Sequence, residues 1–502
     1  MLTIKISSEK LIDSGAQGLV FFARQEQEIE HEQYIEQNYF SGLKQLFKQQ
    51  KWTGSAGEIL VIPVSKNQQL TYIICAGWGK PGSSGFLSIE DYRRTLGSII
   101  RAAESRKISH LALSLPSADL FGVTSEFLAH TTALALRMAA YHFDVYISDQ
   151  DRKYSQPLEV TFTNVHDTAS IQKGIDTGMI IGQAVNQARY WIDLPPSTLT
   201  PPELANKALE IARDTGLKIT LFNEEEVNKM GMGGLAAVSR GSHQDCCLVI
   251  LEYATAKKNA PTIAFVGKGI TFDSGGLSLK PAASMETMKD DMSGAAAVIS
   301  AMQAIARLKP DVNVIGVTPL AENLPSGTAT KPGDIVRFYN GKTAEIKNTD
   351  AEGRLILADA LSYAVKHYKL DAIIDIATLT GACRYALGPF FTGMMSVHDE
   401  LVSRVQKSAD QTGDAVWRLP LTNDYKKAIK STVADLCNVG NSNYYAGVIT
   451  AACFLQAFVD TTPWVHLDIA GTAFDVPDIS YYRPGATGAG VRLLVDIALS
   501  WR

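Results

Sequence analysis

The sequence predicts an α/β protein made of two domains, and three observations lead to that prediction. The chain has 502 residues, and a chain of this length usually forms more than one domain, each with its own hydrophobic core. Short apolar runs typical of strands alternate with helical stretches along the chain. A polar, irregular stretch at 151–170 separates the two halves. We therefore expect an N-terminal α/β domain at 1–165, a linker and connecting helix at 166–192, and a larger C-terminal domain at 193–502.

The first half contains strand-like runs and one well-marked helix. The strands are predicted within QGLVFFAR, EILVIPVS, LTYIICAGWG, SHLALSLP and LEVTFT. The stretch SIEDYRRTLGSIIRAAES has amphipathic spacing, and Ser88 followed by Glu90 is typical of a helix start. No catalytic constellation occurs here. The glycine-rich GWGKPGSSG could cradle a phosphate, but a lone loop of this kind is more often only structural.

The second half begins with a helix and continues with strongly apolar strands. Apolar residues recur at helical spacing from Ile171 to Trp191, and the prolines of LPPSTLTPPELA then exclude a continuous helix. Four near-continuous apolar runs follow, PTIAFVG, VNVIGVTPL, DAIIDIATL and PWVHLDIAG. Runs of this type are typical of a central sheet that is covered on both faces.

Charge and composition narrow the class of protein. The net charge of −5 argues against a non-specific nucleic-acid binder. No apolar run is long enough to span a bilayer, and the N-terminus shows no signal-peptide pattern. The 6 cysteines form no CxxC pair, which indicates buried thiols in a reducing compartment. We expect a cytoplasmic enzyme that contacts neither membrane nor nucleic acid.

Acidic residues and lysines gather between Val266 and Arg354, where apolar strands give way to glycine-rich turns. Carboxylates brought together at strand ends repel one another unless a positive charge lies between them. Hard oxygen ligands of this kind are what one or two divalent cations require, so the pattern predicts a metallohydrolase. The segments are VGKGITFDSGG, MKDDMSGAA and KNTDAEGRL, and the candidate residues are Lys268, Asp273, Lys280, Asp291, Asp350, Glu352 and Arg354.

Each of these residues also has an ordinary structural interpretation when taken alone. Asp291 could be a charge at a helix N-terminus, and Asp350 a helix N-cap. The VGKG turn invites a phosphate-loop interpretation, but Thr262 stands where that loop needs its first glycine. If the backbone is extended at Asp350 and Glu352, the two side chains point the same way, and a helix is expected from about Leu355.

Taken together, GKGITFD, DDMSGAA and NTDAEGRL resemble the leucyl aminopeptidase (cytosol aminopeptidase) family, whose signature NTDAEGRL stands unaltered at 348–355. MGMGGLAAVSRGS, GDIV, DIATLTGA, WVHLDIAGTA and GATGAGVRLL also look like segments of that family. The first half is similar only in general architecture. The resemblance implies a smaller macro-like N-terminal domain and a larger α/β/α zinc-peptidase catalytic domain with a mixed, mostly parallel central sheet.

The resemblance also implies roles for individual residues. It implies two divalent metal ions per subunit, Zn²⁺ or Mn²⁺, bridged by Asp273 and Glu352, and a bicarbonate at Arg354 that serves as general base. Lys280 and Arg354 would be the catalytic pair. The implied metal ligands are Lys268, Asp273, Asp291, Asp350 and Glu352, and the implied substrate contacts are Met288, Thr378, Leu379 and Gly381.

Physical chemistry is consistent with these implied roles. Lys268 can bind a metal only as the neutral amine, so its pKa would have to be much depressed by the cations and by burial. Two ions can hold a hydroxide that attacks the scissile carbonyl at neutral pH. A cationic Lys280 could stabilise the oxyanion that develops, and the planar fork of Arg354 suits a bidentate oxyanion.

The implied activity is release of N-terminal amino acids, preferentially leucine and other apolar residues, from peptides with a free N-terminus by a homohexamer. Tyr444, Tyr445 and Val448 depart from the family's usual small residues, and Asp193 and Ser197 stand where asparagines are usual. The preferred side chain therefore stays open. Met288 alone would more often be a core residue. His466 in an apolar strand is interpreted as a core histidine.

Two alternatives to an active peptidase are considered. A DNA-binding or regulatory role exists in some bacterial members of the family, and the acidic net charge counts against it here. A catalytically dead structural relative is disfavoured because all seven key positions are intact.

Overall fold

The computed structural model of the protein describes residues 2–25, 32–66, 69–149, 158–165 and 167–501. Part of the polar boundary stretch, at 151–157 and 166, lies outside the described residues. The chain divides into two compact units, one of Met1–Gln183 with Asp478–Arg483 and one of Ala184–Pro477 with Pro484–Arg502. The predicted two-domain α/β architecture is confirmed.

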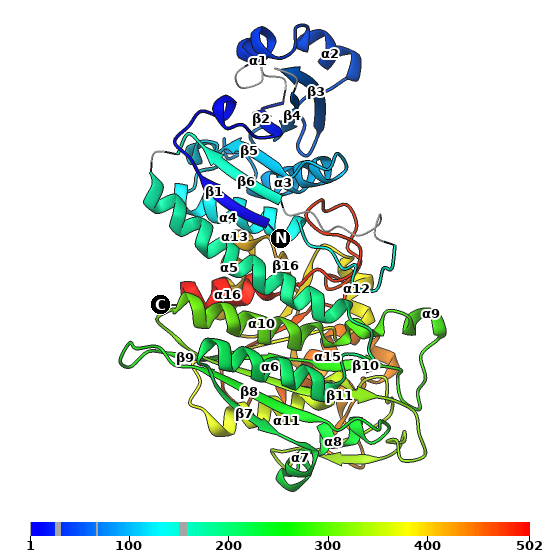
Figure 1. Cartoon of the computed structure of the whole chain (residues 1–502). Helices are drawn as coiled ribbons and strands as arrows, with labels where there is room; N and C mark the ends of the chain where they lie inside the picture. The colour runs from blue at the N-terminus through cyan, green and yellow to red at the C-terminus, as the bar shows by residue number, and fades with distance from the viewer. Residues whose placement is uncertain (1, 26–31, 67–68, 150–157, 166, 502) are drawn as a thin grey trace. The chain divides into compact units, whose positions relative to one another are not determined.

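The first unit is built around a six-stranded sheet in the order β1-β6-β5-β2-β4-β3 (Figure 1). All strand pairs are parallel except β3 with β4. Ser88 caps α3 by accepting a hydrogen bond from the Asp91 backbone N–H at 3.1 Å. The strands are β1 Leu2–Ile6, β2 Gly18–Ala23, β3 Ile59–Lys66, β4 Gln69–Gly77, β5 His110–Ser114 and β6 Leu158–Thr163. The helices are α1 Glu32–Asn38, α2 Leu43–Gln50, α3 Ile89–Glu104 and α4 Ser125–Ala139.

Helix α5, Thr168–Asp193, contains the helix predicted from Ile171 to Trp191 and continues across the division between the units. Leu194 follows it, and Pro201 begins the next helix, α6, so the intervening prolines interrupt the helical path as expected. None of the helices described in full or in part is long and apolar enough to cross a membrane.

The second unit contains a nine-stranded mixed sheet in the order β16-β15-β18-β14-β9-β11-β8-β7, with β10 paired beside β11. Its strands are β7 Lys218–Phe222, β8 Cys247–Tyr253, β9 Thr262–Gly267, β10 Gly269–Asp273, β11 Asn313–Asn323, β14 Ala372–Ala377, β15 Thr392–Met395, β16 Val416–Arg418 and β18 Trp464–Asp468. A small second sheet joins β12 Ile335–Arg337, β13 Thr343–Glu345 and β17 Leu436–Cys437.

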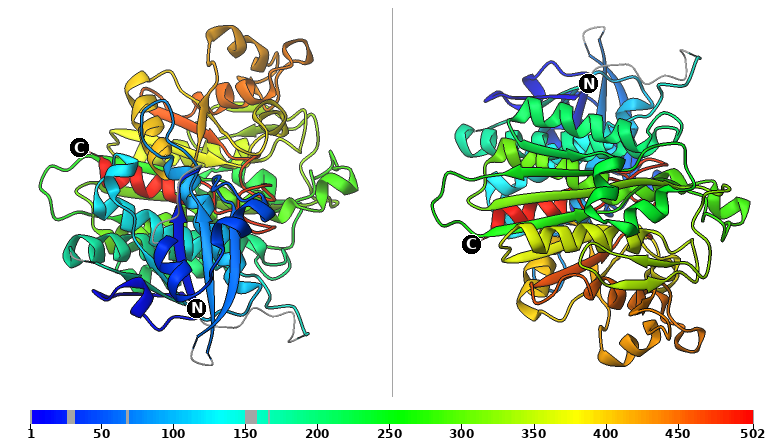
Figure 2. Two further views of the ribbon diagram at one scale, coloured as in Figure 1. Left: turned by 90° about the horizontal axis from the view of Figure 1, so that it is seen from above. Right: turned by 90° about the horizontal axis from the view of Figure 1, so that it is seen from below.

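Helices cover both faces of the large sheet (Figures 1 and 2). Helices α6, α10 and α16 lie over one face, and α8, α11 and α15 lie over the other. The middle strands β14 and β18 are buried along their whole length, which explains their continuous apolar sequences. The helices are α6 Pro201–Thr215, α7 Glu224–Met230, α8 Gly233–Ser239, α9 Ala282–Met285, α10 Ser293–Leu308, α11 Gly353–His367, α12 Gly381–Leu387, α13 Asp399–Thr412, α14 Asn423–Lys426, α15 Gly447–Gln456 and α16 Val491–Ser500.

The central strands β11, β9, β14 and β18 run parallel to one another. Their carboxyl ends therefore meet at one edge of the sheet, which is where α/β proteins usually bind ligands. Lys268, Thr378 and Ile469 follow β9, β14 and β18 directly, and Asn323 ends β11. This edge brings together residues that are far apart in the sequence.

Candidate metal centre

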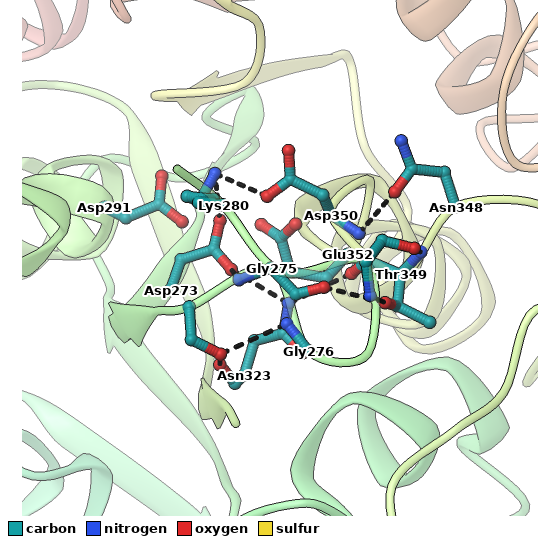
Figure 3. A network of polar contacts seen from close by, with 12 residues as sticks. Asp273, Gly275, Gly276, Lys280, Asp291, Asn323, Asn348, Thr349, Asp350 and Glu352 are labelled. Carbon is teal, nitrogen blue, oxygen red and sulfur yellow. Dashed lines mark hydrogen bonds and ion pairs between the residues drawn. The ribbon is translucent and has the colours of Figure 1, made fainter. Parts of the chain in front are cut away.

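Four carboxylates converge at this edge of the second unit (Figure 3). Oxygen atoms of Asp273, Asp350 and Glu352 all lie within 4.8 Å of one another. Asp273 ends β10, and Asp350 and Glu352 come from the loop before α11. Asp291 is fully buried in the short 3-10 helix η4, Met288–Met292, immediately before α10. The structure thus brings three of the four predicted acidic residues together, and Lys268 links the fourth, Asp291, to Glu352.

The two predicted lysines lie among these carboxylates. Lys268 Nζ is 2.7 Å from Asp291 Oδ1 and 2.9 Å from Glu352 Oε1. Lys280 Nζ is 2.8 Å from Asp273 Oδ2 and 2.6 Å from Asp350 Oδ1. Four negative and two positive charges therefore share the site, which leaves a net negative charge that favours divalent cations.

Two glycines permit this close approach. Gly275 has φ +86°, and a Cβ there would lie 2.9 Å from Asp350 Oδ1. A Cβ on Gly353 would lie 2.4 Å from Lys268 Cε. Any larger residue at Gly353 would push the buried lysine side chain away from Asp291 and Glu352.

The loop carrying Asp350 and Glu352 differs from the extended backbone considered in the sequence analysis. Asp350 lies in a turn, and Glu352 has helical dihedrals of φ −84° and ψ −36°. Helix α11 begins at Gly353, two residues before the predicted start. The turn forms because Asn348 Oδ1 accepts a hydrogen bond from the Asp350 backbone N–H at 2.8 Å. The carboxylates of Asp350 and Glu352 therefore converge because the chain turns between them. They do not lie on one face of an extended strand.

Burial and mutual repulsion change how the carboxyl groups titrate. Burial, helped by the charge of Glu352, raises the pKa of Asp273 to about 6. Burial also raises the pKa of Asp291 well above its ordinary value. Burial acts in the same direction on Glu352, but the positive charges of Lys268 and Lys280 outweigh it and its pKa is lowered.

Lys268 is subject to opposing influences. Burial lowers its pKa, but the negative charges of Asp291, Glu352 and Asp273 outweigh burial, so the pKa lies above its ordinary value. The neutral amine predicted for a metal ligand would therefore need the charge of a bound cation to reverse this balance.

The carboxylate oxygens fit a bound cation. Asp291 Oδ2 and Glu352 Oε2 are buried and accept no hydrogen bond from the described part of the chain. A buried carboxylate oxygen without a donor is costly, and coordination of a cation removes that cost. The second oxygen of each group is already engaged by Lys268. The donor set, which is rich in carboxylate oxygen, suits Mg²⁺, Mn²⁺ or Zn²⁺.

Arg354 lies in the first turn of α11 and is almost fully buried. Its Nη1 donates to the Asn438 carbonyl oxygen at 2.7 Å, and burial lowers the pKa of its guanidinium to about 10. It remains cationic at neutral pH. It forms one wall of a cavity of about 250 Å³ that is otherwise lined by residues between Val439 and Thr450, Tyr445 among them.

The predicted substrate contacts are placed in different ways. Thr378 touches the cluster, because its carbonyl accepts from Lys268 Nζ at 2.9 Å and its hydroxyl donates to Asp291 Oδ1 at 2.8 Å. The Leu379 N–H donates to Asp468 Oδ1 at 3.2 Å. Met288 begins η4, three residues before Asp291, and Gly381 begins α12, where an added Cβ would meet open space.

Sequence reasoning did not identify three buried polar residues that support the site. Asn323 Nδ2 donates to Asp273 Oδ1 at 2.8 Å and to the Thr349 carbonyl at 3.0 Å. Asp468 Oδ2 accepts from the Thr380 hydroxyl at 2.7 Å, which fixes the turn after β14. Asn438 holds the loop before α11. A polar residue at the end of an apolar strand is the signal that could have indicated Asn323 and Asp468.

His466 is a core residue, as expected. It is fully buried, and its Nδ1 lies 2.5 Å from Oδ1 of the Asp375 carboxylate. Burial lowers its pKa, but the Asp375 carboxylate outweighs burial and raises it. The cysteines in the described residues are all buried free thiols.

Two models of one protein family match most of the chain. Residues 186–495 match the catalytic domain of the cytosol aminopeptidase family, and residues 19–150 match the N-terminal domain of the same family. The first match contains every acidic residue and lysine of the cluster.

Relatives in several bacteria are similar over nearly the whole chain. A probable cytosol aminopeptidase of Alkaliphilus oremlandii is 40% identical and covers 91% of both chains. One from Chlorobaculum tepidum is 42% identical over 89% of this chain and 90% of its own. One from Rickettsia felis is 38% identical over 98% of both.

Solved structures are also similar. The bottromycin maturation enzyme BotP has a TM-score of 0.84 and 31% identity, covering 97% of this chain and 99% of its own. The same enzyme in complex with Mn has a TM-score of 0.85 and 32% identity, with the same coverage.

Proposed function

The chain belongs to the cytosol aminopeptidase family, and from that membership we propose that it is a binuclear metal-dependent aminopeptidase that removes leucine and other apolar residues from the N-termini of peptides. The observation that carries this proposal is the cluster of Asp273, Asp350 and Glu352, whose oxygens lie within 4.8 Å of one another. The BotP enzyme, similar over 97% of this chain, has a structure in complex with Mn, which supports metal binding by this chain.

The proposed metal ligands supply both hard oxygen and one amine. Two divalent cations, when bound, would lower the pKa of a water molecule and supply a nucleophile at neutral pH. Zn²⁺ and Mn²⁺ both suit a site of this composition. The residues that would hold them are Lys268, Asp273, Asp291, Asp350 and Glu352.

Lys280 is proposed to bind the scissile carbonyl oxygen. Burial lowers the pKa of its ammonium, but the negative charges of Asp273 and Glu352 outweigh burial and keep the group cationic. Its side chain is more exposed than that of Lys268, at 14% against 3%, so Lys280 is the lysine that a substrate can reach. A fixed cation at the developing oxyanion stabilises the transition state more than the ground state.

Arg354 is proposed to hold a bicarbonate that accepts the proton from the attacking water. Support comes from its fixed position, since Nη1 is bound to the Asn438 carbonyl, and from its Nε, which is buried and donates no hydrogen bond to the described residues. A guanidinium with free donors beside a cavity of about 250 Å³ offers a planar anion two parallel hydrogen bonds.

Selection of free N-termini is proposed to follow from the bound metals. The free α-amine of a peptide would bind one of the two cations, which a blocked N-terminus could not do. The apolar side chain of the first residue is proposed to contact Met288, Thr378, Leu379 and Gly381, of which Thr378 contacts Asp291 directly.

We also propose that the protein acts as a homohexamer in the cytoplasm. The domain division at 1–165, 166–192 and 193–502 likewise remains our proposal. It assigns every proposed site residue to the third of these segments.

Removal of cluster carboxylates tests the proposed activity. Asp350→Asn and Glu352→Gln are expected to lower the rate of leucine release from leucyl-p-nitroanilide by at least about 10³-fold, because each removes one negative ligand while keeping the side-chain shape. Circular dichroism should show an unchanged fold.

The matched control is Asp410→Asn, which alters an exposed carboxylate on α13. We expect wild-type turnover from this variant. Undiminished turnover in folded Asp350→Asn and Glu352→Gln would refute the proposal.

A further inference from the structure

We propose that Asn438 is a positioning residue for the metal-binding loop and for Arg354. It is fully buried and directly follows β17, in a segment to which sequence reasoning assigned no role. The inference rests on the proposed function, because it concerns how the ligands and the catalytic arginine of that site are held.

The loop that Asn438 serves has no regular structure of its own. Residues 346–352 connect β13 to α11 and carry Asp350 and Glu352. Outside a helix or sheet, backbone N–H and C=O groups need other partners, and without them the loop would not keep one conformation. A carboxylate that serves as a ligand needs such a fixed backbone.

The Asn438 side chain supplies these partners on both sides of Asp350. Its Oδ1 accepts from the Lys347 N–H at 2.8 Å and from the Asn348 N–H at 3.4 Å. Its Nδ2 donates to the Asn348 carbonyl at 2.6 Å and to the Ala351 carbonyl at 3.4 Å. The side-chain amide thus donates hydrogen bonds to the loop backbone and accepts hydrogen bonds from it, as a neighbouring β-strand would.

The Asn438 backbone extends this link to two further elements. Its N–H donates to the Glu345 carbonyl at 3.0 Å, which continues the pairing of β13 with β17. Its carbonyl accepts from Arg354 Nη1 at 2.7 Å. One residue therefore fixes the positions of Asp350, Glu352 and Arg354 relative to β13.

Asn438 is not a catalytic residue, because its side-chain contacts are to loop backbone and none is to the carboxylates. Partners of this kind commonly change metal affinity or activity by about 10- to 100-fold when they are removed. A displacement of about 1 Å at the reacting groups costs a similar factor in rate. The effect should therefore fall on metal affinity and kcat more than on KM.

The test compares Asn438→Ala and Asn438→Asp with the wild type. Asn438→Ala removes all four side-chain contacts. Asn438→Asp keeps the size of the side chain and one accepting oxygen but turns a second oxygen toward the Asn348 and Ala351 carbonyls. Asn340→Ala is the matched control, since Asn340 also accepts a backbone N–H, from Lys342 at 3.0 Å, in an exposed turn.

Three experiments are made on the full chain: calorimetric titration of chelator-treated protein with Mn²⁺, thermal unfolding, and steady-state kinetics of leucine release, which gives kcat and KM. We expect both Asn438 variants to lose about 10- to 100-fold in Mn²⁺ affinity and at least about 10-fold in kcat, with KM changed by less than about threefold. Asn340→Ala should match the wild type in all three.

Folded Asn438 variants with wild-type Mn²⁺ affinity and kcat would overturn the inference, even if their unfolding temperature falls. If Asn438→Ala does not fold, the near-isosteric Asn438→Asp decides by the same measurements. A wild type that releases no amino acid would refute the proposed function alone, because the Mn²⁺ titrations would still decide the role of Asn438.

Discussion

Asp273 is the residue at which burial and charge oppose each other most clearly. Its carboxylate accepts from Gly275 N–H and Asn323 Nδ2, both at 2.8 Å, and is paired with Lys280. These contacts favour the charged form, yet burial and the charge of Glu352 prevail and raise its pKa to about 6. Cation binding at Asp273 would therefore displace a proton when the pH is near or below 6.

A pH dependence of metal binding follows from this pKa. A protonated Asp273 carboxyl group binds a cation less well than the carboxylate does. Because the pKa of Asp273 is about 6, protonation competes with the cation as the pH falls through that value. Mn²⁺ affinity should fall by roughly tenfold for each pH unit below 6 through Asp273, and it should keep rising above about pH 7, because Lys268, whose pKa lies above its ordinary value, must lose a proton to serve as a ligand. Calorimetric titration between pH 5 and pH 8 measures this, and an affinity that is flat over that range would contradict the argument.

The raised pKa of Asp273 also makes the stability of the fold depend on pH. Because the folded-state pKa of Asp273 is raised above the ordinary value of 3.8, its contribution to stability is fully present below about pH 4 and is lost as the pH rises through 6. At neutral pH the charged Asp273 therefore destabilises the metal-free fold, and bound cations would offset this effect.

Single residues were predictable from the sequence where a motif marks them. The cluster residues stand in three short, dense motifs, and the structure brings all four carboxylates and both lysines together. Their catalytic and ligand roles remain predictions. Asn438 could not be found in this way, since a lone asparagine in LCNVG has no periodicity or spacing, and its partners lie about 90 positions earlier in the chain.

Whole elements were predicted best where burial is most complete. The strands β9, β11, β14 and β18 lie within the four predicted apolar runs or, in β11, extend beyond one. The strands β12, β13 and β17 were not predicted, because segments of two or three residues carry no periodic signal. Strand β1 was also not predicted, although the sequence LTIKI alternates apolar and polar residues.

Helix α11 joins the candidate site to the hydrophobic core, and Asp359 anchors the part of the helix beyond its first turn. Asp359 is fully buried and accepts from the Leu235 N–H at 2.9 Å and the Tyr339 N–H at 2.8 Å. It therefore joins α11 to α8 and to the segment after β12. These contacts lie beyond the first turn, which carries Arg354, so their loss should change stability more than catalysis.

Asp359→Ala should lower the free energy of unfolding by about 3 kcal/mol, because the N–H groups of Leu235 and Tyr339 lose their carboxyl acceptor. Urea unfolding followed by circular dichroism measures this change. Asp359→Asn, which keeps one accepting oxygen, should lose less. A loss below about 1 kcal/mol in Asp359→Ala would show that the link is dispensable.

At the scale of the whole molecule, function is concentrated in the second unit. All the proposed ligands, both catalytic residues and Asn438 lie within Ala184–Pro477. They come from strand ends and loops around one edge of a sheet whose parallel order brings distant segments together. The fold class followed from the sequence because apolar strands and helices alternate, whereas strand order depends on long-range pairing that no local pattern encodes.

The central claim is that the carboxylate cluster binds two divalent cations on which peptide hydrolysis depends. The most direct measurement is the number of Mn²⁺ or Zn²⁺ ions bound per chain after chelator treatment and titration, with leucine release recorded at each point. We predict that release is abolished by the chelator and is restored as two ions bind per chain. Full activity in chelator-treated protein, or saturation with no ion bound to the cluster, would contradict the claim.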